Sequence, residues 1–536
     1  MTELKSIDYD DVCRTFACEI PATFNFGRDV VDHWAEDPDK VAILWSDASG
    51  ATRSLTFDDV MRASNRLANM LVSQGLQPGD RVIVQLPRLP EWQIALTACL
   101  KVGAVPIPCI TMLTGKDVAY RINHSSARAA ITLSEETGKF QGLDGVDVRI
   151  AIGTPVDGWV PYARCDDCLE TFTAYDTPVD DPAIIYYTSG STGNPKGVCH
   201  AARALFIWKV SADYWLNLTP DDVMWCTADT GWSKAGTSIL FGPWGVGAAA
   251  VFHEGPFDPK HRFEILERER VTVFCAAPTE LRRLIQEDVK EFDLSALKLT
   301  VSAGESVNPE IVDAWARLTG VPLLDGYGQT ETLMTVLNYH GMPVKPGSMG
   351  RPLPGVTVAV YGEDGQIAGA GAEGQLAIAL PNPQVMLHYW NDPERTASQR
   401  VSVGGQEWFL TGDNVRQDED GYIFFEGRAD DIITSSGYRI GPQEVENALI
   451  EHPAVQESAA VGMPDPDRGE IVKAFIVLTD PALASEALCT ELQDHVKRTT
   501  APYKYPRAIE FITELPKTVS GKIRRNVLRS RDKGSS

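Results

Sequence analysis

The chain has 536 residues, 43% of them hydrophobic, a formal net charge of −24 and a pI of about 4.8. This length exceeds one small domain and indicates about two to four domains or subdomains. The acidic balance argues against nucleic acids and anionic membranes as bulk partners. It does not exclude anionic small molecules, because a local cluster of basic side chains can bind them.

The N-terminus is acidic and polar, so no signal peptide is expected, and no apolar stretch reaches the roughly 18 residues of a membrane helix. The ten cysteines are scattered. Cys165 and Cys168 form a CxxC without a second pair, so no metal site is expected there. Dispersed cysteines favour a reducing compartment, and we expect a cytoplasmic protein.

The first 430 residues alternate helix-like and strand-like segments. Thr56 and Asp59 have capping-box spacing at the start of a predicted helix that closes at Gly75. The segment 81–86 reads as a buried strand, and 91–103 reads as a helix that ends at a glycine.

Further along, 271–277, 297–304 and 322–328 read as strands separated by two helices, the first of which begins at about residue 278. This β-α-β-α-β order implies largely parallel sheets with helices on their faces. After residue 430 the pattern becomes mixed, with predicted helices at 442–450 and 491–499 and strands at 456–463 and 472–478.

We therefore predict an α/β fold with two domains. A large N-terminal domain of parallel and mixed sheets with helices spans residues 1–430, and a small, mobile α+β domain spans residues 431–536. The boundary falls in the sequence GRADD without a long linker, which is typical of a hinge.

The strongest local motif is YYTSGSTGNPKG at 186–197, where a strand runs into a loop of Ser, Thr and Gly and then into a helix-like segment. Such loops direct backbone N–H groups and hydroxyls toward phosphate oxygens. A flexible loop without function is the alternative. The motif is not a P-loop of the Walker type, because Gly197 follows Lys196 where that motif requires Ser or Thr.

Basic residues concentrate at the C-terminal end, where residues 497–536 contain eleven Lys and Arg against three Asp and Glu. On charge alone, a solvated basic tail is the simplest interpretation. The motif 516–525, PKTVSGKIRR, lies inside this segment.

The loop at 186–197 resembles the signature of the adenylate-forming superfamily, which includes acyl-CoA synthetases, luciferases and peptide-synthetase adenylation domains. Other motifs of that superfamily follow in order: SAGES (302–306), DGYGQTET (325–332), TGD (411–413), EGRADDIITSSGYRIGPQEVENAL (426–449) and PKTVSGKIRR (516–525). The resemblance covers essentially the whole chain and is strongest to medium-chain acyl-CoA synthetases and benzoate-type CoA ligases. It implies that ATP activates a carboxylic acid as an acyl-adenylate and that coenzyme A then accepts the acyl group.

The resemblance assigns ATP binding to five regions of the chain: the phosphate loop, the adenine border, the 325–330 segment, the ribose site and the 516–525 motif. The implied ATP-binding residues are Thr188, Ser189, Gly190, Ser191, Thr192, Gly193, Lys196, Gly304, Glu305, Ser306, Asp325, Gly326, Tyr327, Gly328, Gln329, Thr330, Asp413, Arg428 and Lys522. Glu331 is the implied ligand of Mg²⁺, a cation that prefers oxygen ligands.

Lys522 is the implied catalytic residue, together with Thr330 and Glu331. The reaction joins a carboxylate to an α-phosphate, and an ammonium group between these anions neutralises their charge in the transition state. Asp430 matches the hinge about which the C-terminal domain moves between the two half-reactions. Lys522 also resembles the lysine at which bacterial relatives are acetylated, so an acetyltransferase and a deacetylase are possible partners.

Coenzyme A is expected to bind the C-terminal domain, where basic side chains would hold its phosphates. The implied positions are Ser436, Gly437, Tyr438, Arg439, Arg468, Lys497, Tyr505, Pro506 and Arg507. The acyl group is expected between 227–236, 302–304 and 326–333, lined by Trp232, Ser233, Ala235, Gly236, Ala303, Gly328 and Leu333.

Two features bear on the acid. Acetate-specific members of the superfamily carry a tryptophan where this chain has Gly328, so its absence implies room for a longer or cyclic acid. Lys234 is the only fixed charge expected at the pocket itself, and with an outward orientation it would leave the pocket uncharged. A medium-chain, branched or aromatic monocarboxylic acid is therefore expected, and the sequence does not choose among them.

Other readings remain: an adenylation enzyme that loads a carrier protein, a luciferase-like oxygenase and an inactive nucleotide-binding module. The basic C-terminal positions disfavour the first, the C-terminus lacks the SKL peroxisomal signal, and the intact Asp413, Glu331 and Lys522 disfavour the third. The oligomeric state is not readable from the sequence.

Overall fold

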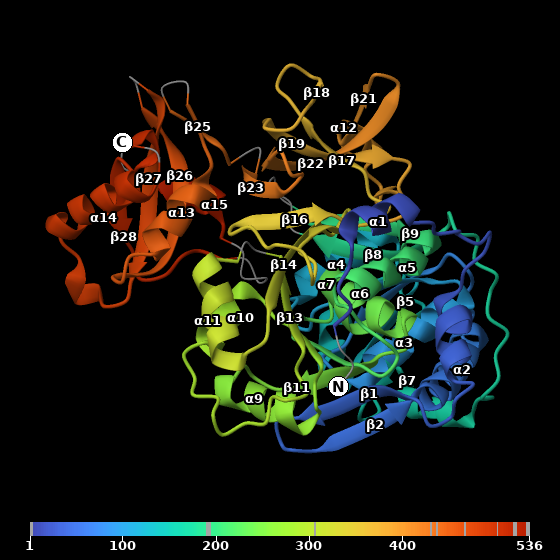
Figure 1. Ribbon diagram of the computed structural model, residues 1–536. Helices are drawn as coiled ribbons and strands as arrows, with labels where there is room; N and C mark the ends of the chain where they lie inside the picture. Colours follow the sequence, from blue (N-terminus) through green and yellow to red (C-terminus); the bar gives the residue numbers. More distant parts are fainter. Residues whose placement is uncertain are drawn as a thin grey trace. The chain divides into compact units, whose positions relative to one another are not determined.

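The computed structural model describes residues 4–188, 194–304, 307–428, 431–435, 438–465, 468–500, 502–517 and 523–531, with backbone alone at 434, 438, 439 and 502. The chain divides into two compact units (Figure 1). Unit 1 comprises residues 1–344, 350–356 and 381–398, and unit 2 comprises residues 345–349, 357–380 and 399–536. The boundary predicted at residue 430 falls inside unit 2 and stays a prediction.

Unit 1 contains the following elements, and β16 includes residues of both units: α1 (Tyr9–Thr15), η1 (Gly27–Asp32), β1 (Val41–Asp47), β2 (Thr52–Thr56), α2 (Phe57–Ser73), β3 (Arg81–Gln85), α3 (Pro90–Val102), β4 (Val105–Cys109), α4 (Gly115–Ser125), β5 (Ala129–Leu133), η2 (Ser134–Phe140), β6 (Val148–Ile152), β7 (Val160–Pro161), η3 (Tyr162–Asp167), β8 (Pro182–Thr188), β9 (Lys196–Ala201), α5 (Ala202–Ile207), α6 (Lys209–Tyr214), β10 (Val223–Cys226), α7 (Ser233–Ala235), η4 (Gly236–Leu240), α8 (Phe241–Gly245), β11 (Ala249–Glu254), α9 (Pro259–Arg268), β12 (Val273–Cys275), α10 (Pro278–Leu284), β13 (Leu299–Ala303), α11 (Pro309–Thr319), β14 (Leu323–Gln329), β15 (Leu333–Leu337), β16 (Ser348–Pro352), β20 (His388–Tyr389) and α12 (Pro393–Ser398).

The main sheet of unit 1 has a parallel centre, in the order β14-β13-β12-β10-β11-β1, with antiparallel β15 and β2 on either side. The predicted β-α-β-α-β order is confirmed by β12, α10, β13, α11 and β14. Since these strands are parallel, their carboxyl ends meet at one edge of the sheet, which is where open α/β sheets bind ligands.

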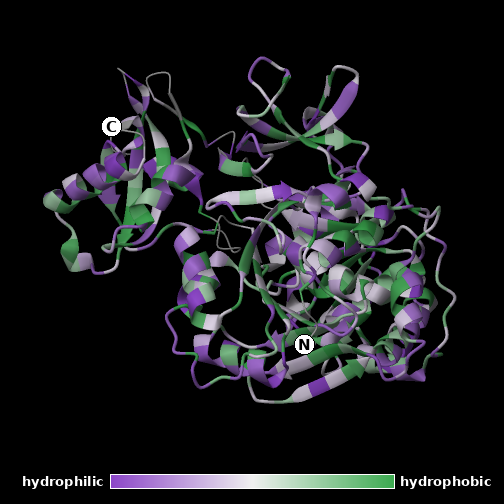
Figure 2. Cartoon of the chain, in the orientation of Figure 1, coloured by the Kyte–Doolittle hydropathy of each residue, from purple (hydrophilic) through white to green (hydrophobic). Residues whose placement is uncertain are grey.

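A second sheet of unit 1, in the order β4-β3-β5-β6-β7, is entirely parallel. Most residues of β3, β4 and β5 are hydrophobic and buried, as expected for a parallel sheet covered on both faces. Figure 2 colours the chain by the hydropathy of each residue. The predicted capping box of α2 is present, because the Thr56 side chain accepts from the Asp59 backbone and Asp59 reciprocates. Helix α3 ends as predicted at Gly103, whose φ of 80° is left-handed.

The phosphate-loop motif lies in a third sheet, ordered β20-β9-β8. Strand β8 was predicted, but the helix-like segment expected after the loop is strand β9, antiparallel to β8, with Thr188 opposite Lys196. The prediction of a helix there was wrong. Five of the six β9 residues are buried, and β9 pairs on both sides, so tertiary packing decides its conformation.

Unit 2 contains these elements: β17 (Val358–Tyr361), β18 (Ile367–Ala368), β19 (Glu373–Leu380), β21 (Arg400–Val403), β22 (Gln406–Gln417), β23 (Ile423–Arg428), β24 (Ile433–Ser435), β25 (Tyr438–Ile440), α13 (Pro442–Ile450), β26 (Val455–Asp465), β27 (Gly469–Leu478), η5 (Pro481–Leu483), α14 (Glu486–Thr499), η6 (Pro502–Lys504), β28 (Ala508–Phe511) and α15 (Arg525–Arg531).

Unit 2 has an antiparallel sheet, ordered β18-β17-β19-β22-β23 with β21 beside β22, and a C-terminal sheet, ordered β25-β24-β27-β26 with β28 beside β27. Helices α13 and α14 pack with the second sheet around Ile433, Val445, Leu449 and Leu492. The helices and strands predicted after residue 430 are thus confirmed.

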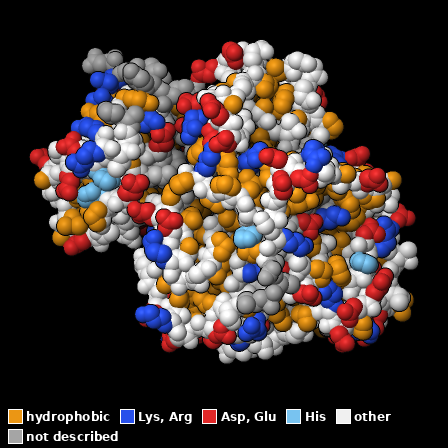
Figure 3. Space-filling model, viewed as in Figure 1, with side chains coloured by type: hydrophobic (Ala, Val, Ile, Leu, Met, Phe, Trp, Pro, Cys, Tyr) orange, Lys and Arg blue, Asp and Glu red, His pale blue; other side chains and the backbone are white. Residues whose placement is uncertain are grey.

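Charged side chains of both signs are interspersed over the face seen in Figure 3. Within the described part of the chain, no helix combines the length and the hydrophobicity needed to cross a membrane. The predicted fold class, α/β with a large sheet-rich part and a small α+β part, is confirmed.

Candidate active site

Three of the expected site segments follow neighbouring strands of the main sheet. Residues 227–236 follow β10, Gly304 follows β13, and Thr330 and Glu331 follow β14. Because β10, β12, β13 and β14 are parallel neighbours, their carboxyl ends bring these segments to one edge. The sheet therefore explains how segments about one hundred residues apart reach one site.

Glu331 is bound by two side chains at this edge. Lys196 Nζ donates to Glu331 Oε1 at 3.0 Å and to Tyr389 Oη at 3.1 Å, and Tyr389 Oη donates to the same carboxylate oxygen at 2.8 Å. The Lys196 ammonium also lies 4.6 Å from the centre of the Tyr389 ring. The predicted phosphate-binding lysine and the predicted magnesium ligand are thus in direct contact.

The charge of Glu331 is set by these neighbours. Burial alone would raise the pKa of this carboxyl, but the Lys196 ammonium and the Tyr389 hydroxyl outweigh burial and hold the pKa below its usual value. Glu331 is only 7% exposed, so the ion pair is poorly screened by water. The carboxylate is therefore ionised at neutral pH.

Thr330 has two contacts of its own. Its carbonyl accepts from His200 Nε2 at 2.6 Å, and its hydroxyl accepts from Ser233 Oγ at 3.3 Å. Ser233 belongs to the predicted acyl pocket, so Thr330 lies between that pocket and Glu331. We refer to Lys196, His200, Thr330, Glu331 and Tyr389 as the Glu331 cluster.

The neighbouring Asp325 carries less charge than the sequence suggests. Burial raises the pKa of Asp325 to about 8, so the carboxyl is largely protonated at neutral pH. Its Oδ1 accepts from the backbone N–H of Gly326 at 2.9 Å. Gly326, Tyr327, Gly328 and Gln329 continue along β14 toward Thr330.

Gly328 does not support the argument made from it about pocket size. A Cβ atom at Gly328 would lie 1.9 Å from the Leu333 carbonyl oxygen and 2.9 Å from the Met334 Cα. The glycine is required because β14 and β15 approach closely, with a register shift between Tyr327 and Gly328. Glycine at this position therefore reflects the close approach of the β14 and β15 backbones, and a tryptophan side chain would clash with the backbone of Leu333.

The remaining acyl-pocket residues lie on α7, η4 and the end of β13, apart from Trp232 just before α7 and Leu333 at the start of β15. Trp232 is partly buried against two hydrophobic clusters, and Ala235 is fully buried. A Cβ on Gly236 would lie 2.2 Å from the Tyr186 hydroxyl, so this glycine packs against an aromatic wall.

Lys234 is oriented differently from the expectation. Its Nζ donates to the carbonyl oxygen of Ala303 at 2.7 Å, so the ammonium turns toward the predicted pocket instead of solvent. The expectation of an uncharged pocket is therefore not supported.

Asp413 and Arg428, the predicted ribose-site residues, lie opposite each other on β22 and β23. Arg428 Nη1 donates to Asp413 Oδ1 at 3.0 Å, and Asp413 is 4% exposed whereas the Arg428 side chain is 44% exposed. Gly412 lies inside β22 and has a φ of 71°, a left-handed conformation that favours glycine, beside an irregularity in the pairing of β22 with β19.

Two of the predicted CoA-binding cations lie close to the ring of a third predicted CoA-binding residue, Tyr505. Lys497 Nζ lies 4.4 Å from the centre of the Tyr505 ring, and the Arg507 guanidinium lies 4.8 Å from it and donates to Tyr505 Oη at 2.8 Å. We call these residues the Tyr505 cluster. Pro506 is buried beside it, and Arg468 lies exposed before β27.

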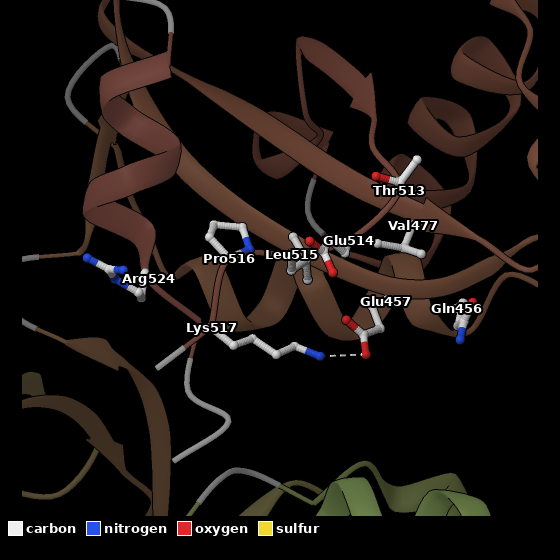
Figure 4. A pocket seen from close by; sticks show the side chains of 9 residues that line it. All are labelled: Gln456, Glu457, Val477, Thr513, Glu514, Leu515, Pro516, Lys517 and Arg524. Atoms are coloured by element: carbon white, nitrogen blue, oxygen red, sulfur yellow. Dashed lines mark hydrogen bonds and ion pairs between the residues drawn. The ribbon is translucent and has the colours of Figure 1, made fainter. Parts of the chain in front are cut away.

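The described residues on either side of Lys522 are bound to each other. Lys517 pairs with Ile523 in a β-bridge, and the Arg524 N–H donates to the Pro516 carbonyl at 2.8 Å. Lys517 Nζ also binds Glu457 at 2.7 Å, beside a cavity of about 610 Å³ (Figure 4). Arg525 then binds the buried Glu446 with two hydrogen bonds, at 2.7 and 2.8 Å.

Several predicted site residues lie outside the described residues, so the structure does not place them: Ser189, Gly190, Ser191, Thr192, Gly193, Glu305, Ser306, Asp430, Ser436, Gly437 and Lys522. The side chains of Tyr438 and Arg439 are likewise not described.

The sequence reasoning missed Tyr389, His200 and Gln384. Tyr389 and Gln384 lie in 381–398, a segment that returns to unit 1 and matches none of the motifs considered. His200 had one usable signal, since it is a polar residue inside the apolar run that becomes β9.

The described residues contain no group of three or more His, Cys, Asp and Glu side chains that could hold a metal ion. Mg²⁺ is usually bound through one or two carboxylates while substrate phosphates and water supply the other ligands. Glu331, ionised and next to the phosphate-loop lysine, is a suitable carboxylate.

The chain was compared with known families and structures. The AMP-binding enzyme family model matches residues 30–390, and the AMP-binding enzyme C-terminal domain matches residues 444–522. Acyl-coenzyme A synthetase ACSM3, mitochondrial, of Mus musculus is 43% identical, with 98% of this chain and 93% of that protein covered.

Two solved structures resemble the whole chain. Anthranilate CoA ligase AuaEII with anthranoyl-AMP has a TM-score of 0.87 and 31% identity, covering 96% of this chain and 98% of its own. A benzoate CoA ligase from Burkholderia xenovorans LB400 has a TM-score of 0.83 and 30% identity, covering 94% and 100%. The resemblance stated from the motifs is confirmed, and this chain belongs to the AMP-binding enzyme family.

Proposed function

We propose that this chain activates a medium-chain, branched or aromatic monocarboxylic acid with ATP and Mg²⁺ and transfers the acyl group to coenzyme A. The reaction class, an AMP-forming acyl-CoA synthetase, is confirmed by the relatives. The observation that carries the site assignment is the contact of Lys196 and Tyr389 with Glu331 at the carboxyl edge of the main sheet.

In the first half-reaction, a carboxylate oxygen of the acid attacks the α-phosphorus of ATP, and pyrophosphate leaves with the electrons of the broken P–O bond. Lys196 and the loop at 188–193 hold the β- and γ-phosphates, and Asp413 accepts hydrogen bonds from the ribose hydroxyls. Lys522 neutralises the charge that concentrates between the two anions. Glu331 would hold Mg²⁺, which would supply further positive charge to the phosphate oxygens.

In the second half-reaction, the CoA sulfur attacks the acyl carbonyl and AMP leaves. No protein nucleophile is required, because AMP is a good leaving group. The Tyr505 cluster supports this assignment, since its two cations and its aromatic ring suit the phosphates and adenine of CoA. Movement of the C-terminal domain about Asp430 would switch the enzyme from the first half-reaction to the second.

The acid class is supported by the apolar lining and by the two ligases of aromatic acids among the similar structures. Each missing buried methylene costs about 0.8 kcal/mol, so four of them correspond to roughly 3 kcal/mol, or about two orders of magnitude in kcat/KM. The chain should therefore prefer a ring or at least about four carbons over acetate. Because Lys234 faces the pocket, ring- or chain-bound hydroxyl groups belong in the test.

The test is AMP release with acetate, butyrate, octanoate, benzoate and hydroxybenzoate, each with and without CoA. We expect turnover that depends on CoA and favours the larger acids. Release that requires a carrier protein instead of CoA would support a carrier-loading enzyme, and no release with any acid would support an inactive nucleotide-binding module.

Two further points stay predictions, a cytoplasmic location and control of Lys522 by acetylation. Acetylation removes the charge on which the first half-reaction depends. Protein that is stoichiometrically acetylated at Lys522 should be inactive until it is deacetylated, and full activity of that protein would exclude the control.

A further inference from the structure

The turn that carries Thr330 and Glu331 has an irregular backbone. It connects β14 to β15 and ends at Leu333, the first residue of β15, whose φ of 56° lies in the left-handed region that residues other than glycine seldom adopt. It follows the register shift at Gly328, where β14 and β15 approach too closely for any side chain. Such a backbone persists only where surrounding contacts hold it.

Those contacts are made to three consecutive carbonyl groups of the turn and to one in β15. The Thr330 carbonyl accepts from His200 Nε2 at 2.6 Å, and the Glu331 carbonyl accepts from the Met386 N–H at 2.8 Å. Gln384 Nε2 donates to the carbonyls of Thr332 at 3.0 Å and Met334 at 2.8 Å.

Of these donors, His200 is the one that binds the carbonyl of Thr330, a predicted catalytic residue. It lies on β9, four residues after Lys196, and is fully buried. Burial lowers the pKa of His200 to about 4, so the imidazole is neutral at physiological pH. A carbonyl oxygen only accepts, so the single ring proton resides on Nε2 and is directed at Thr330.

We propose that His200 is a positioning residue for adenylation, which holds Thr330 and Glu331 in place through its hydrogen bond to the Thr330 carbonyl. The Lys196 ammonium, at the start of the same strand, binds the Glu331 carboxylate. Two side chains of β9 thus hold this part of the turn. His200 binds the backbone carbonyl of Thr330, and Lys196 binds the carboxylate of Glu331. The inference rests on the proposed roles of Thr330 and Glu331.

The test compares His200→Leu, which removes the donor, with His200→Gln, whose amide nitrogen can reach a similar position. His253→Leu is the matched control, because His253 is also a buried histidine of unit 1 and contacts Ser46 Oγ at 3.0 Å. Acyl-AMP formation, thioester formation from supplied acyl-AMP and thermal unfolding are measured for each variant.

We expect His200→Leu to lower the rate of acyl-AMP formation by about tenfold or more, as for an unpaired buried carbonyl, with little change in the KM for ATP. Thioester formation should be unchanged, and His200→Gln should recover most of the loss. His253→Leu should lower the unfolding temperature without slowing adenylation selectively. Adenylation within about twofold of wild type in His200→Leu, or an equal fall of both half-reactions, would overturn the proposal.

Amide hydrogen exchange supplies a readout that does not depend on activity. His200→Leu should speed exchange in the peptides covering 329–337 and 384–387, whereas His200→Gln and His253→Leu should not. Unchanged exchange in His200→Leu would show that His200 does not hold the turn. A wild-type protein that forms no acyl-AMP would contradict the proposed function, and the exchange result would still decide the role of His200.

Discussion

The Glu331 cluster and the Tyr505 cluster both use positive charge, but they differ in burial. In unit 1, His200, Glu331 and Tyr389 are 0%, 7% and 2% exposed, and each is held by short hydrogen bonds. In unit 2, the Lys497 side chain is 37% exposed and its ammonium is shared between Asp494 and the Tyr505 ring.

This difference in burial predicts how each cluster should respond to a substitution. Removing one buried, hydrogen-bonded group leaves an unsatisfied partner in a region of low polarity, so its effect is large and local. Removing one partly exposed cation costs little, since water and neighbouring cations replace it. Substitutions in the Glu331 cluster should therefore slow adenylation strongly. Substitutions in the Tyr505 cluster should raise the KM for CoA by small factors.

The largest effect is expected for Lys522→Ala. Loss of one group that stabilises transition-state charge lowers rates by about two to three orders of magnitude. Acyl-AMP formation should fall by that amount, whereas thioester formation from supplied acyl-AMP should persist. Lys497→Ala is the control lysine and should show the opposite selectivity. An equal loss of both half-reactions in Lys522→Ala would contradict this assignment.

The next effect concerns two glycines. In Gly328→Ala the new Cβ meets the backbone of Leu333, and overpacking of this kind costs about 1–3 kcal/mol or more. We expect adenylation and thermal stability to fall, with no rescue by a second substitution. In Gly236→Ala the new Cβ would instead clash with the Tyr186 hydroxyl. Removing that hydroxyl with Tyr186→Phe should therefore restore adenylation and stability. A Gly328→Ala protein with normal adenylation and stability would refute the close approach.

Asp413→Asn tests the ribose site. Hydrogen bonds to a charged group contribute about 1.5–3 kcal/mol, so kcat/KM for ATP should fall roughly 10- to 100-fold. The carboxamide keeps the size of the side chain, and one oxygen remains to accept from Arg428. The KM for CoA should stay unchanged. A variant whose kcat/KM for ATP equals that of the wild type would exclude Asp413 from the site.

The smallest effects belong to the Tyr505 cluster. Partly exposed ion pairs are typically worth up to about 1 kcal/mol, so Lys497→Ala or Arg507→Ala should each raise the KM for CoA about fivefold or less. Salt should raise that KM in the wild type and less so in the double variant, because ions screen exposed charges. A KM for CoA that is independent of salt in the wild type would contradict the assignment.

The sequence predicted the elements well where local patterns were strong, as for the capping box at Thr56 and the helix stop at Gly103. It failed at 196–201, where pairing on both sides makes a strand of a segment that reads as a helix. The role of Gly328 could not be predicted, because it depends on the backbone of a neighbouring strand.

The candidate site was predictable where its residues stand in motifs, as Lys196, Glu331, Asp413 and Arg428 do. Tyr389 was not predictable in this way. It reaches Glu331 only because the chain returns from unit 2 to unit 1 and pairs with β9. That arrangement depends on the topology of the chain, which local motifs in a single sequence do not predict.

The most direct test measures the two half-reactions separately, in single turnover, for Glu331→Gln and Arg507→Ala. Glu331→Gln removes the buried charge and should slow acyl-AMP formation about tenfold or more while leaving thioester formation from supplied acyl-AMP intact. Arg507→Ala should form acyl-AMP at the wild-type rate and require more CoA for the second step. If either variant slows both steps equally, the assignment of the two clusters to separate half-reactions is wrong.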